Sequence, residues 1–172
     1  MEFDKLIKER YSVRKFKSEK VKKEDLEKIL QAGLLAPTGC NFQPQRILVI
    51  DSIDGVEKIK DCTKCHFNAP TYLLVCHNKE ESWVRPYDKE LSSPVDATIV
   101  ATHMMLKAHD IGVGCCWVMH FNPFKMRETF NIPKNLSPVA LLVMGYPDKT
   151  AKPLDMHYQS KSLKDVVLYD SF

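Results

Sequence analysis

Apolar residues recur three and four positions apart in several stretches of the chain, which is the spacing of one helix face. Phe3, Leu6 and Ile7 predict a short opening helix. A stripe of leucine and isoleucine predicts a second helix over about 23–35. Pro37 ends it, because the residue before a proline is biased out of the helical region. Further helices are expected at about 56–60, 94–109 and 123–130.

The helix expected to begin near residue 94 is the longest and is apolar around much of its circumference. A helix that is apolar on most sides is typical of a buried position, so we expect it to be the central helix. Asp96, His103 and His109 lie along it at spacings that do not converge on one point. Capping or surface roles are therefore expected for these three residues.

Short continuous apolar runs bounded by turn residues predict strands. Such runs occupy residues 46–50, 71–76, 115–119 and 139–144, and residues 163–169 form another possible strand. Helices and strands are interleaved, but the connections are too few and too uneven for a doubly wound parallel sheet. The predicted fold class is α+β, a mixed sheet flanked by helices.

Two long polar stretches lack a clear period. Residues 78–94 carry Trp83, Arg85 and Tyr87, and a loop this long in a compact domain is often a binding loop or a lid. The tail that begins at residue 148 has little core to join within its own chain. We expect the tail to clasp a neighbouring chain.

Length and composition describe one ordinary globular domain spanning residues 1–172, with 44% hydrophobic and 27% charged residues. The net charge of +3 is too small and too dispersed to favour a nucleic acid or a membrane surface as partner. The charged N-terminal residues lack the apolar core of a signal peptide, and no apolar run reaches the roughly 20 residues that a membrane span needs. The six cysteines are expected as reduced thiols, and the expected location is cytoplasmic.

The first candidate site consists of Arg10, Ser12 and Arg14, which are spaced two apart. In an extended segment this spacing puts all three side chains on one face. Two guanidinium groups with a hydroxyl between them suit a dianionic phosphate, because arginine offers planar bidentate donors. Taken alone, the same spacing fits a solvated basic edge better than a phosphate site.

Two further segments are candidates. Residues 36–44 combine glycine, which allows close approach of backbone to a ligand, with Asn41 and Gln43, whose amides can read the edge of a heteroaromatic ring. Alone, this segment is equally a plain loop from helix to strand. The pair Gly112-x-Gly114 is not a dinucleotide fingerprint, because the third glycine is absent and a strand follows.

Residues 62–66 match the Cys-x-x-Cys-His pattern of c-type haem attachment. That chemistry needs export and a second axial ligand, and the sequence identifies neither. A redox or metal role for Cys62 and Cys65 stays open beside the plainer interpretation of reduced thiols near a helix end. Cys115 and Cys116 precede a core strand and are expected to pack as small apolar side chains.

Four motifs stand in a fixed order along the chain. They are Arg-Tyr-Ser-Val-Arg at 10–14, Ala-Pro-Thr-Gly-Cys-Asn-Phe-Gln-Pro at 36–44, Gly-Val-Gly-Cys-Cys-Trp-Val at 112–118 and Val-Met-Gly-Tyr-Pro at 143–147. This ordered set resembles the nitroreductase family of flavoenzymes over nearly the whole chain. The resemblance implies a three-layer α/β/α sandwich around a mixed, mainly antiparallel sheet. It also implies a homodimer in which the C-terminal arm, residues 148–172, wraps the partner subunit and swaps a strand onto it.

The resemblance further implies which residues bind flavin mononucleotide (FMN). Arg10, Ser12 and Arg14 match the phosphate and ribityl site, with Tyr11 contributing its backbone. The other implied positions are Pro37, Thr38, Gly39 and Asn41, which approach the FMN of the other subunit, Trp117, Val118, Met119 and His120 at the ring, and Lys161 at the phosphate. His120 is alternatively a hydrogen-bond donor in the substrate pocket.

The implied function is ping-pong transfer of hydride or electrons from NADH or NADPH to an electron-poor acceptor such as a nitroaromatic or a quinone. Since the flavin ring performs the chemistry, no side chain is expected to be strictly catalytic and no metal is expected. Two alternatives stay open. One is a reductive dehalogenase or flavin-fragmenting enzyme of the same fold, and the other is a non-catalytic flavin or electron carrier.

Overall fold

The computed structural model describes all 172 residues. Its helices are α1 (Phe3–Glu9), α2 (Lys23–Leu34), α3 (Ile53–Cys62), α4 (Ser93–Asp110), α5 (Pro123–Thr129) and α6 (Leu163–Val166). Its strands are β1 (Gln45–Ile50), β2 (Thr71–Asn78), β3 (Gly114–Val118) and β4 (Leu136–Gly145), and short 3-10 turns lie at Gly39–Asn41, Lys79–Glu81 and Asp155–Tyr158. All helices and strands predicted between residues 1 and 147 are confirmed, with shifts of a few residues at their ends.

The four strands form one sheet in the order β1-β2-β4-β3, and every neighbouring pair is antiparallel. One isolated parallel bridge, between Ser12 and Cys115, joins the segment after α1 to the outer side of β3. Since β1 and β3 are the two edges of this sheet, residues near β1 and residues near β3 lie on opposite sides of the molecule. The predicted α+β fold and mainly antiparallel pairing are thereby confirmed, and the only parallel contact with the sheet is this isolated bridge.

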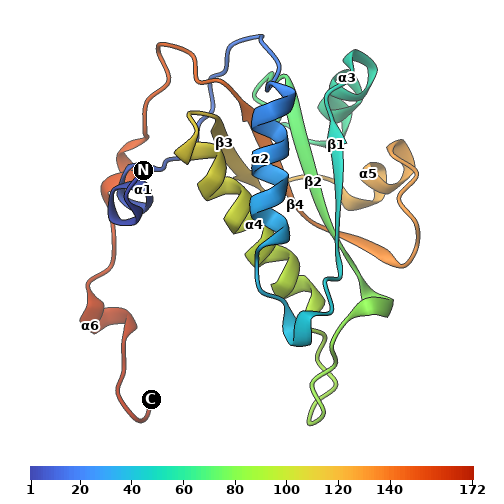
Figure 1. Ribbon diagram of the computed structural model, residues 1–172, viewed down its shortest axis with the longest axis vertical. Coiled ribbons are helices and arrows are strands. Elements are labelled where there is room, and N and C mark those ends of the chain that lie inside the picture. The colour runs from blue at the N-terminus through green and yellow to red at the C-terminus, as the bar shows by residue number, and fades with distance from the viewer.

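Side chains on the two faces of the sheet enter separate hydrophobic cores. Leu73 and Val75 of β2 pack on one face with residues of α2 and α4, whereas Tyr72 and Leu74 pack on the other face with residues of α3 and α5. Figure 1 shows α2 and α4 in front of the sheet and α3 and α5 beside the strands at the opposite face. The fold is therefore a three-layer sandwich.

The expected central helix is α4, whose 18 residues make it the longest in the chain. Val100, Ala101 and Met104 are fully buried in the core that α4 shares with α2 and the sheet. Although α4 is apolar on several sides, neither it nor any other helix has the length and hydropathy needed to cross a bilayer.

A buried histidine joins β2 to the start of α4. The His77 side chain is 6% exposed, and its Nδ1 lies 2.8 Å from the Oγ of Ser93, which is fully buried. Burial lowers the pKa of His77 below its ordinary value of 6.5, because the charged imidazolium loses its hydration there. The folded chain therefore favours the neutral imidazole of His77.

We expect the folded chain to lose stability as the pH falls below 6.5. The unfolded chain protonates His77 near that value while the folded chain resists protonation, so acid favours unfolding. The stabilising contribution is fully present above pH 6.5 and is lost as the pH falls through the folded pKa, which lies below 6.5. Urea unfolding at several pH values and one protein concentration measures it. His77→Asn, which keeps a nitrogen near Ser93, should flatten the slope, and an unchanged slope would contradict this assignment.

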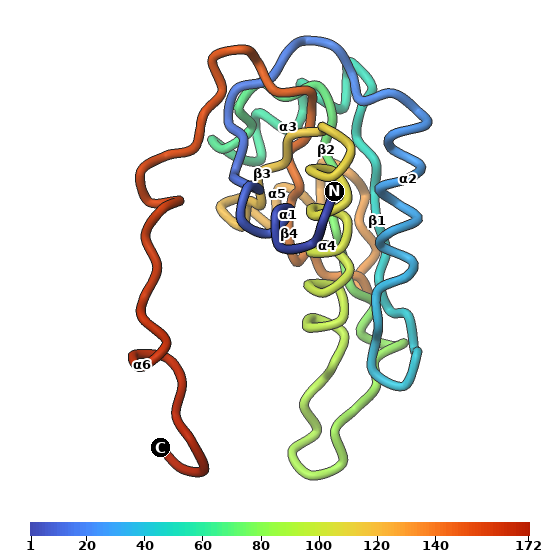
Figure 2. The backbone as a smooth tube through the Cα atoms, turned by 60° about the vertical axis from the view of Figure 1, so that its left-hand side comes forward, coloured from blue at the N-terminus to red at the C-terminus, as the bar shows by residue number.

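Residues 82–92 form a hairpin where the sequence predicts a long loop. An isolated antiparallel bridge joins Val84 to Leu91, and the amide of Arg85 donates to the carbonyl of Glu90 over 2.9 Å. Figures 1 and 2 show this hairpin projecting beyond the body of the molecule at the N-terminal end of α4. Tyr87 at its tip is 95% exposed.

The C-terminal arm runs away from the rest of the chain, as both figures show. The strand predicted at residues 163–169 is wrong within this chain: Leu163–Val166 form one helical turn. Asp165 accepts hydrogen bonds from the backbone amide and hydroxyl of Ser162, so a local capping box stabilises the turn. A strand needs a neighbouring strand for its hydrogen bonds, and this arm has none beside it. Every residue from 158 to 172 is exposed.

Candidate functional site

The segment that carries Arg10, Ser12 and Arg14 runs along the outer edge of β3. α1 ends at Glu9, and the chain continues extended from Arg10. The amide of Val13 donates to the carbonyl of Cys115 over 3.1 Å, and the side chain of Val13 is buried. Because Val13 points into the core, Ser12 and Arg14 point to the opposite side of the extended segment. The strand-like spacing predicted for this segment is confirmed.

The guanidinium groups of Arg10 and Arg14 are half-buried and form no ion pair with a carboxylate. Arg14 donates to the backbone carbonyl of Ser12 over 3.1 Å, and Nη1 of Arg10 lies 3.9 Å from the sulfur of Met105. The other arginines have stronger acceptors: Arg46 pairs with Glu81, Arg85 pairs with Asp88, and Arg127 donates to three backbone carbonyls. Arg10 and Arg14 therefore retain donors for an external anion.

Cys115 and Cys116 of β3 lie beside this segment, which meets β3 at the bridge between Ser12 and Cys115. Burial raises the pKa of the Cys116 thiol, while Arg14, Ser12 and Arg10 each act on that pKa in the opposite direction. Cys115 is also buried, and burial raises its thiol pKa strongly. Both cysteines are buried and neutral and act as packing residues, as the sequence predicts.

Gly114 allows the segment at Val13 to approach β3 closely. A Cβ atom added at Gly114 would lie 2.9 Å from Cγ1 of Val13 and 3.0 Å from two further Val13 carbons. Real Cβ atoms do not approach other atoms that closely, so any side chain at position 114 pushes the segment outward. The other glycine of the pair, Gly112, is required for a different reason, its φ of +82° after α4.

Gly114→Ala should lower the stability of the chain and, if Arg10 and Arg14 bind an anionic ligand, the affinity for that ligand. Overpacking of this kind typically costs about 1–3 kcal/mol, and it displaces the segment that carries the arginines. Thermal unfolding and ligand titration measure the two effects. The control is Gly114→Ala combined with Val13→Ala, which removes the colliding carbons and should recover part of the affinity. An unaffected single variant would mean that the segment does not depend on this contact.

The residues after β3 lie at the same edge of the sheet. Trp117 and Val118 end the strand, and the next two residues, Met119 and His120, are exposed. Met119 is 69% exposed, which is unusual for a methionine that directly follows a buried strand. Of the four sequence-predicted ring positions, Met119 and His120 are therefore open at the end of β3, whereas Val118 is buried and Trp117 packs against the core.

The loop that follows α3 holds this surface in place. The Thr63 hydroxyl donates to the carbonyl of His120, and Sγ of Cys65 lies 3.8 Å from Nδ1 of His120. The amide of Asn122 donates to the carbonyl of Cys62 over 2.8 Å. These contacts fix the peptide groups on both sides of residue 121.

The cysteines of the Cys-x-x-Cys-His motif point to different surroundings. Cys62 is buried, and its thiol lies 3.5 Å from the carbonyl of Lys58. Cys65 faces His120, and Nδ1 of His66 accepts from the amide of Asn68 over 3.0 Å. The structure contains no group of three or more histidine, cysteine or acidic side chains arranged to hold a metal ion.

The loop predicted to approach the cofactor from the other subunit lies at the opposite edge of the sheet. Pro37, Thr38, Gly39 and Asn41 stand between α2 and β1, far along the sheet from β3. Cys40, Asn41 and Gln43 all have positive φ values, of 47°, 58° and 51°. Non-glycine residues adopt such values at a cost, and clusters of them occur mainly at ligand sites and switches. This loop and the arginine segment therefore do not meet within one chain.

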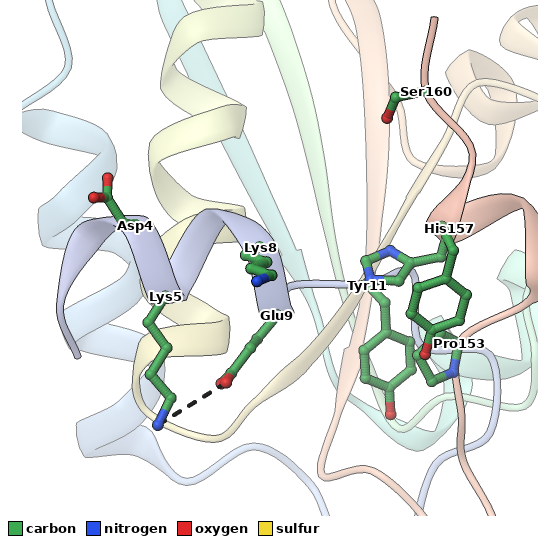
Figure 3. A pocket seen from close by; sticks show the side chains of 9 residues that line it. Asp4, Lys5, Lys8, Glu9, Tyr11, Pro153, His157 and Ser160 are labelled. Atoms are coloured by element: carbon green, nitrogen blue, oxygen red, sulfur yellow. Dashed lines mark ion pairs between the residues drawn. The ribbon is translucent and has the colours of Figure 1, made fainter.

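The start of the C-terminal arm passes beside α1 and Tyr11. The ring of Tyr11 meets that of His157 edge-on at a centroid distance of 6.3 Å, and His157 meets Tyr158 at 4.9 Å. Figure 3 shows a groove between these rings and the charged side of α1. Lys161, the predicted basic ligand in the arm, is exposed just beyond this groove and forms no hydrogen bond or ion pair.

The sequence patterns did not identify several residues that support this site. Thr63 and Cys65 lie inside a motif whose thiols drew attention to haem and metals instead of to His120. Asp96, expected at a cap or on the surface, is 3% exposed and accepts a hydrogen bond from Gly39 in the loop after α2. Its partner is distant in sequence, so only the folded chain shows the connection.

Comparison with known proteins accounts for the order of these segments. A family model described as "Nitroreductase family" matches residues 7–68 and 64–146, which include the arginine segment, the loop after α2 and β3. The chain belongs to the nitroreductase family. The resemblance inferred from the four motifs is confirmed.

The most similar proteins include several of known structure. A crystal structure of a nitroreductase family protein from Clostridium difficile superposes with a TM-score of 0.93 at 40% identity and covers 100% of both chains. A structure described as a nitroreductase in complex with FMN, from Desulfovibrio desulfuricans, superposes at 0.80 with 25% identity over 100% of this chain and 98% of that one. A curated relative from Bacillus subtilis, an FMN reductase [NAD(P)H], is 26% identical over 82% of this chain and 64% of its own length.

Proposed function

We propose that this nitroreductase family member is an FMN-dependent oxidoreductase that carries electrons from NADH or NADPH to an electron-poor acceptor. One observation carries the proposal: Arg10 and Arg14 keep unpaired, half-buried guanidinium donors at the same sheet edge as the open surface at Met119 and His120. A site for an anion beside a site for a flat ring along β3 matches FMN, in which a phosphate is joined to a flavin. Relatives described as FMN-dependent and as complexes with FMN support it.

The donor set fits FMN at both ends. Arg10, Ser12 and Arg14 would hold the phosphate through charge-assisted hydrogen bonds, and Tyr11 would contribute its backbone. Trp117, Val118, Met119 and His120 would line the ring, with the backbone amides of the last two directed at its N5 and O4 edge. Bound FMN supplies the chemistry, which is acceptance of a hydride at N5 and its delivery to an acceptor. The amides would stabilise negative charge on the reduced ring, because fixed dipoles in a sheltered site need no reorganisation.

We further propose that residues 1–172 act as a single FMN-binding domain in a homodimer that shares its two sites. In one chain, Pro37, Thr38, Gly39 and Asn41 lie at the sheet edge opposite the arginine segment, so they would serve the FMN of the other subunit. Residues 148–172 would wrap that subunit and bring Lys161 to a phosphate. Large apolar side chains exposed along this arm support the wrapping: Leu154, Met156, Tyr158, Leu163, Val166, Leu168, Tyr169 and Phe172.

Stopped-flow reduction of the FMN-loaded protein tests the proposal. NADH or NADPH should bleach the flavin absorbance, and steady-state velocities with a quinone or a nitroaromatic should give the parallel lines of a ping-pong mechanism. Product analysis under air and under nitrogen separates this activity from flavin fragmentation and dehalogenation. An FMN-loaded protein that neither nicotinamide reduces would rule the proposed function out.

A further inference from the structure

A buried carboxylate joins the loop after α2 to the projecting hairpin. Asp96 in the first turns of α4 is 3% exposed. Its Oδ1 accepts from the amide of Gly39 over 2.8 Å, and its Oδ2 accepts from the hydroxyl of Ser92 over 2.8 Å. No lysine, arginine or histidine forms an ion pair with Asp96. Its charge therefore depends on these two hydrogen bonds.

The loop on one side of this carboxylate is closely fitted. A Cβ atom added at Gly39 would lie 2.9 Å from Oγ of Ser92 and 3.4 Å from Cβ of Trp83. Gly39 thus presses its backbone against both ends of the hairpin base. After Gly39, residues Cys40, Asn41 and Gln43 have positive φ values. Non-glycine residues keep this backbone conformation only where surrounding contacts impose it.

The hairpin on the other side is attached mainly at its base. The amide of Ser92 donates to the carbonyl of Trp83 over 3.0 Å, and the amide of Ser93 donates to Oγ of Ser82 over 3.0 Å. Beyond these residues the hairpin projects into solvent, and residues 84–90 are all exposed. Figure 2 shows the base of the hairpin beside the loop that connects α2 to β1.

We propose that Asp96 is a positioning residue that holds the loop 37–43 and the hairpin 82–92 as one unit, so that a ligand which orders the loop also orders the hairpin. The inference rests on the proposed function, in which this loop approaches FMN. The cause is the shared carboxylate: once either hydrogen bond breaks, the buried charge is left undersolvated and the other contact weakens with it. The hairpin, which carries Trp83, Arg85 and Tyr87, thereby becomes sensitive to occupancy of the flavin site.

Tryptic cleavage after Lys89 reports the order of the hairpin independently of turnover. Lys89 is exposed and is followed by Glu90 rather than by a proline, so trypsin can cleave after it at a rate that its acidic neighbours reduce. In the wild-type protein, saturating FMN should slow the cut at this bond by about tenfold, because protection follows the population of the open state. Mass spectrometry isolates this cut from cuts elsewhere, and flavin fluorescence gives the FMN dissociation constant in the same samples.

Three variants separate the two halves of the connection. Ser92→Ala removes the hairpin bond alone, so FMN affinity should stay within about threefold while most of the FMN-dependent protection of Lys89 disappears. Asp96→Ala should lose the protection and weaken FMN binding by about tenfold or more. Asp96→Asn can still accept a hydrogen bond from Gly39 and donate one to Ser92, so it should recover most of the FMN affinity and most of the protection of Lys89. It also keeps the test decisive if the alanine variant misfolds. Thr98→Ala, which removes an exposed hydroxyl of α4 that donates to the carbonyl of Pro94, is the matched control.

The outcomes distinguish this inference from the proposed function. If the wild-type protein does not bind FMN, the proposed function fails; faster cleavage at Lys89 in ligand-free Ser92→Ala than in Thr98→Ala would still support the connection through Asp96. If FMN binds but Ser92→Ala and Asp96→Ala are both protected like the wild type, the inference is overturned. Equal cleavage of all ligand-free proteins overturns it as well.

Discussion

Replacing Arg10 and Arg14 together by alanine should weaken FMN binding by at least about a hundredfold while leaving the chain folded. Each charge-assisted hydrogen bond to a phosphate contributes roughly 1.5–3 kcal/mol, and every 1.4 kcal/mol corresponds to a factor of ten in affinity. Neither guanidinium holds the fold together through an ion pair, and both are half-buried rather than enclosed. Flavin content after purification and titration of the apoprotein with FMN measure the loss, and far-ultraviolet circular dichroism checks the fold.

The matched control for this pair is Arg46→Ala. Arg46 is an exposed arginine of β1 whose guanidinium pairs with Glu81 at the far edge of the sheet. Exposed ion pairs contribute little to stability, so this variant should keep its FMN and its melting temperature. If the double variant retains flavin as tightly as Arg46→Ala does, the phosphate lies elsewhere and the arginine segment is a basic edge after all.

The sequence could predict the extended course of the arginine segment because the relevant information is local. Arg10, Ser12 and Arg14 are spaced two apart, and in an extended segment that spacing favours one face. The structure adds Val13, whose burial against Gly114 fixes which face is which. The sequence pattern Gly112-x-Gly114 did not show why Gly114 is needed, because the pattern does not indicate that the Val13 side chain packs against this position.

Contacts between distant segments could not be predicted in this way. Asp96 and Gly39 are 57 positions apart, and so are Thr63 and His120, and nothing in either local pattern indicates the other member. The strand predicted at 163–169 was wrong for a related reason. Its apolar residues fit a strand, but a strand forms only where another strand supplies hydrogen bonds, and Ser162 and Asp165 offer a local helical turn instead.

Deleting residues 158–172 should convert the protein to a folded monomer that no longer retains FMN. None of these residues is buried in its own chain, so their removal leaves both hydrophobic cores intact. Burial of apolar surface lowers the free energy by about 25 cal/mol per Å². The exposed apolar side chains of the arm therefore favour a partner that covers them. In the proposed homodimer the arm supplies that burial and also carries Lys161, so the deletion removes both the association and a phosphate contact.

Light scattering coupled to size-exclusion chromatography measures the mass of the truncated chain, and its absorbance spectrum reports the flavin. Two substituted full-length chains separate the apolar contribution from the length of the arm. Leu168→Ser with Tyr169→Ser should weaken the dimer, because both side chains are exposed and apolar, at 60% and 85%. Lys164→Ser with Asp170→Ser changes two polar residues of the same arm and should leave the mass unchanged. A truncated chain that remains dimeric and yellow would show that the two subunits associate and hold FMN without the arm.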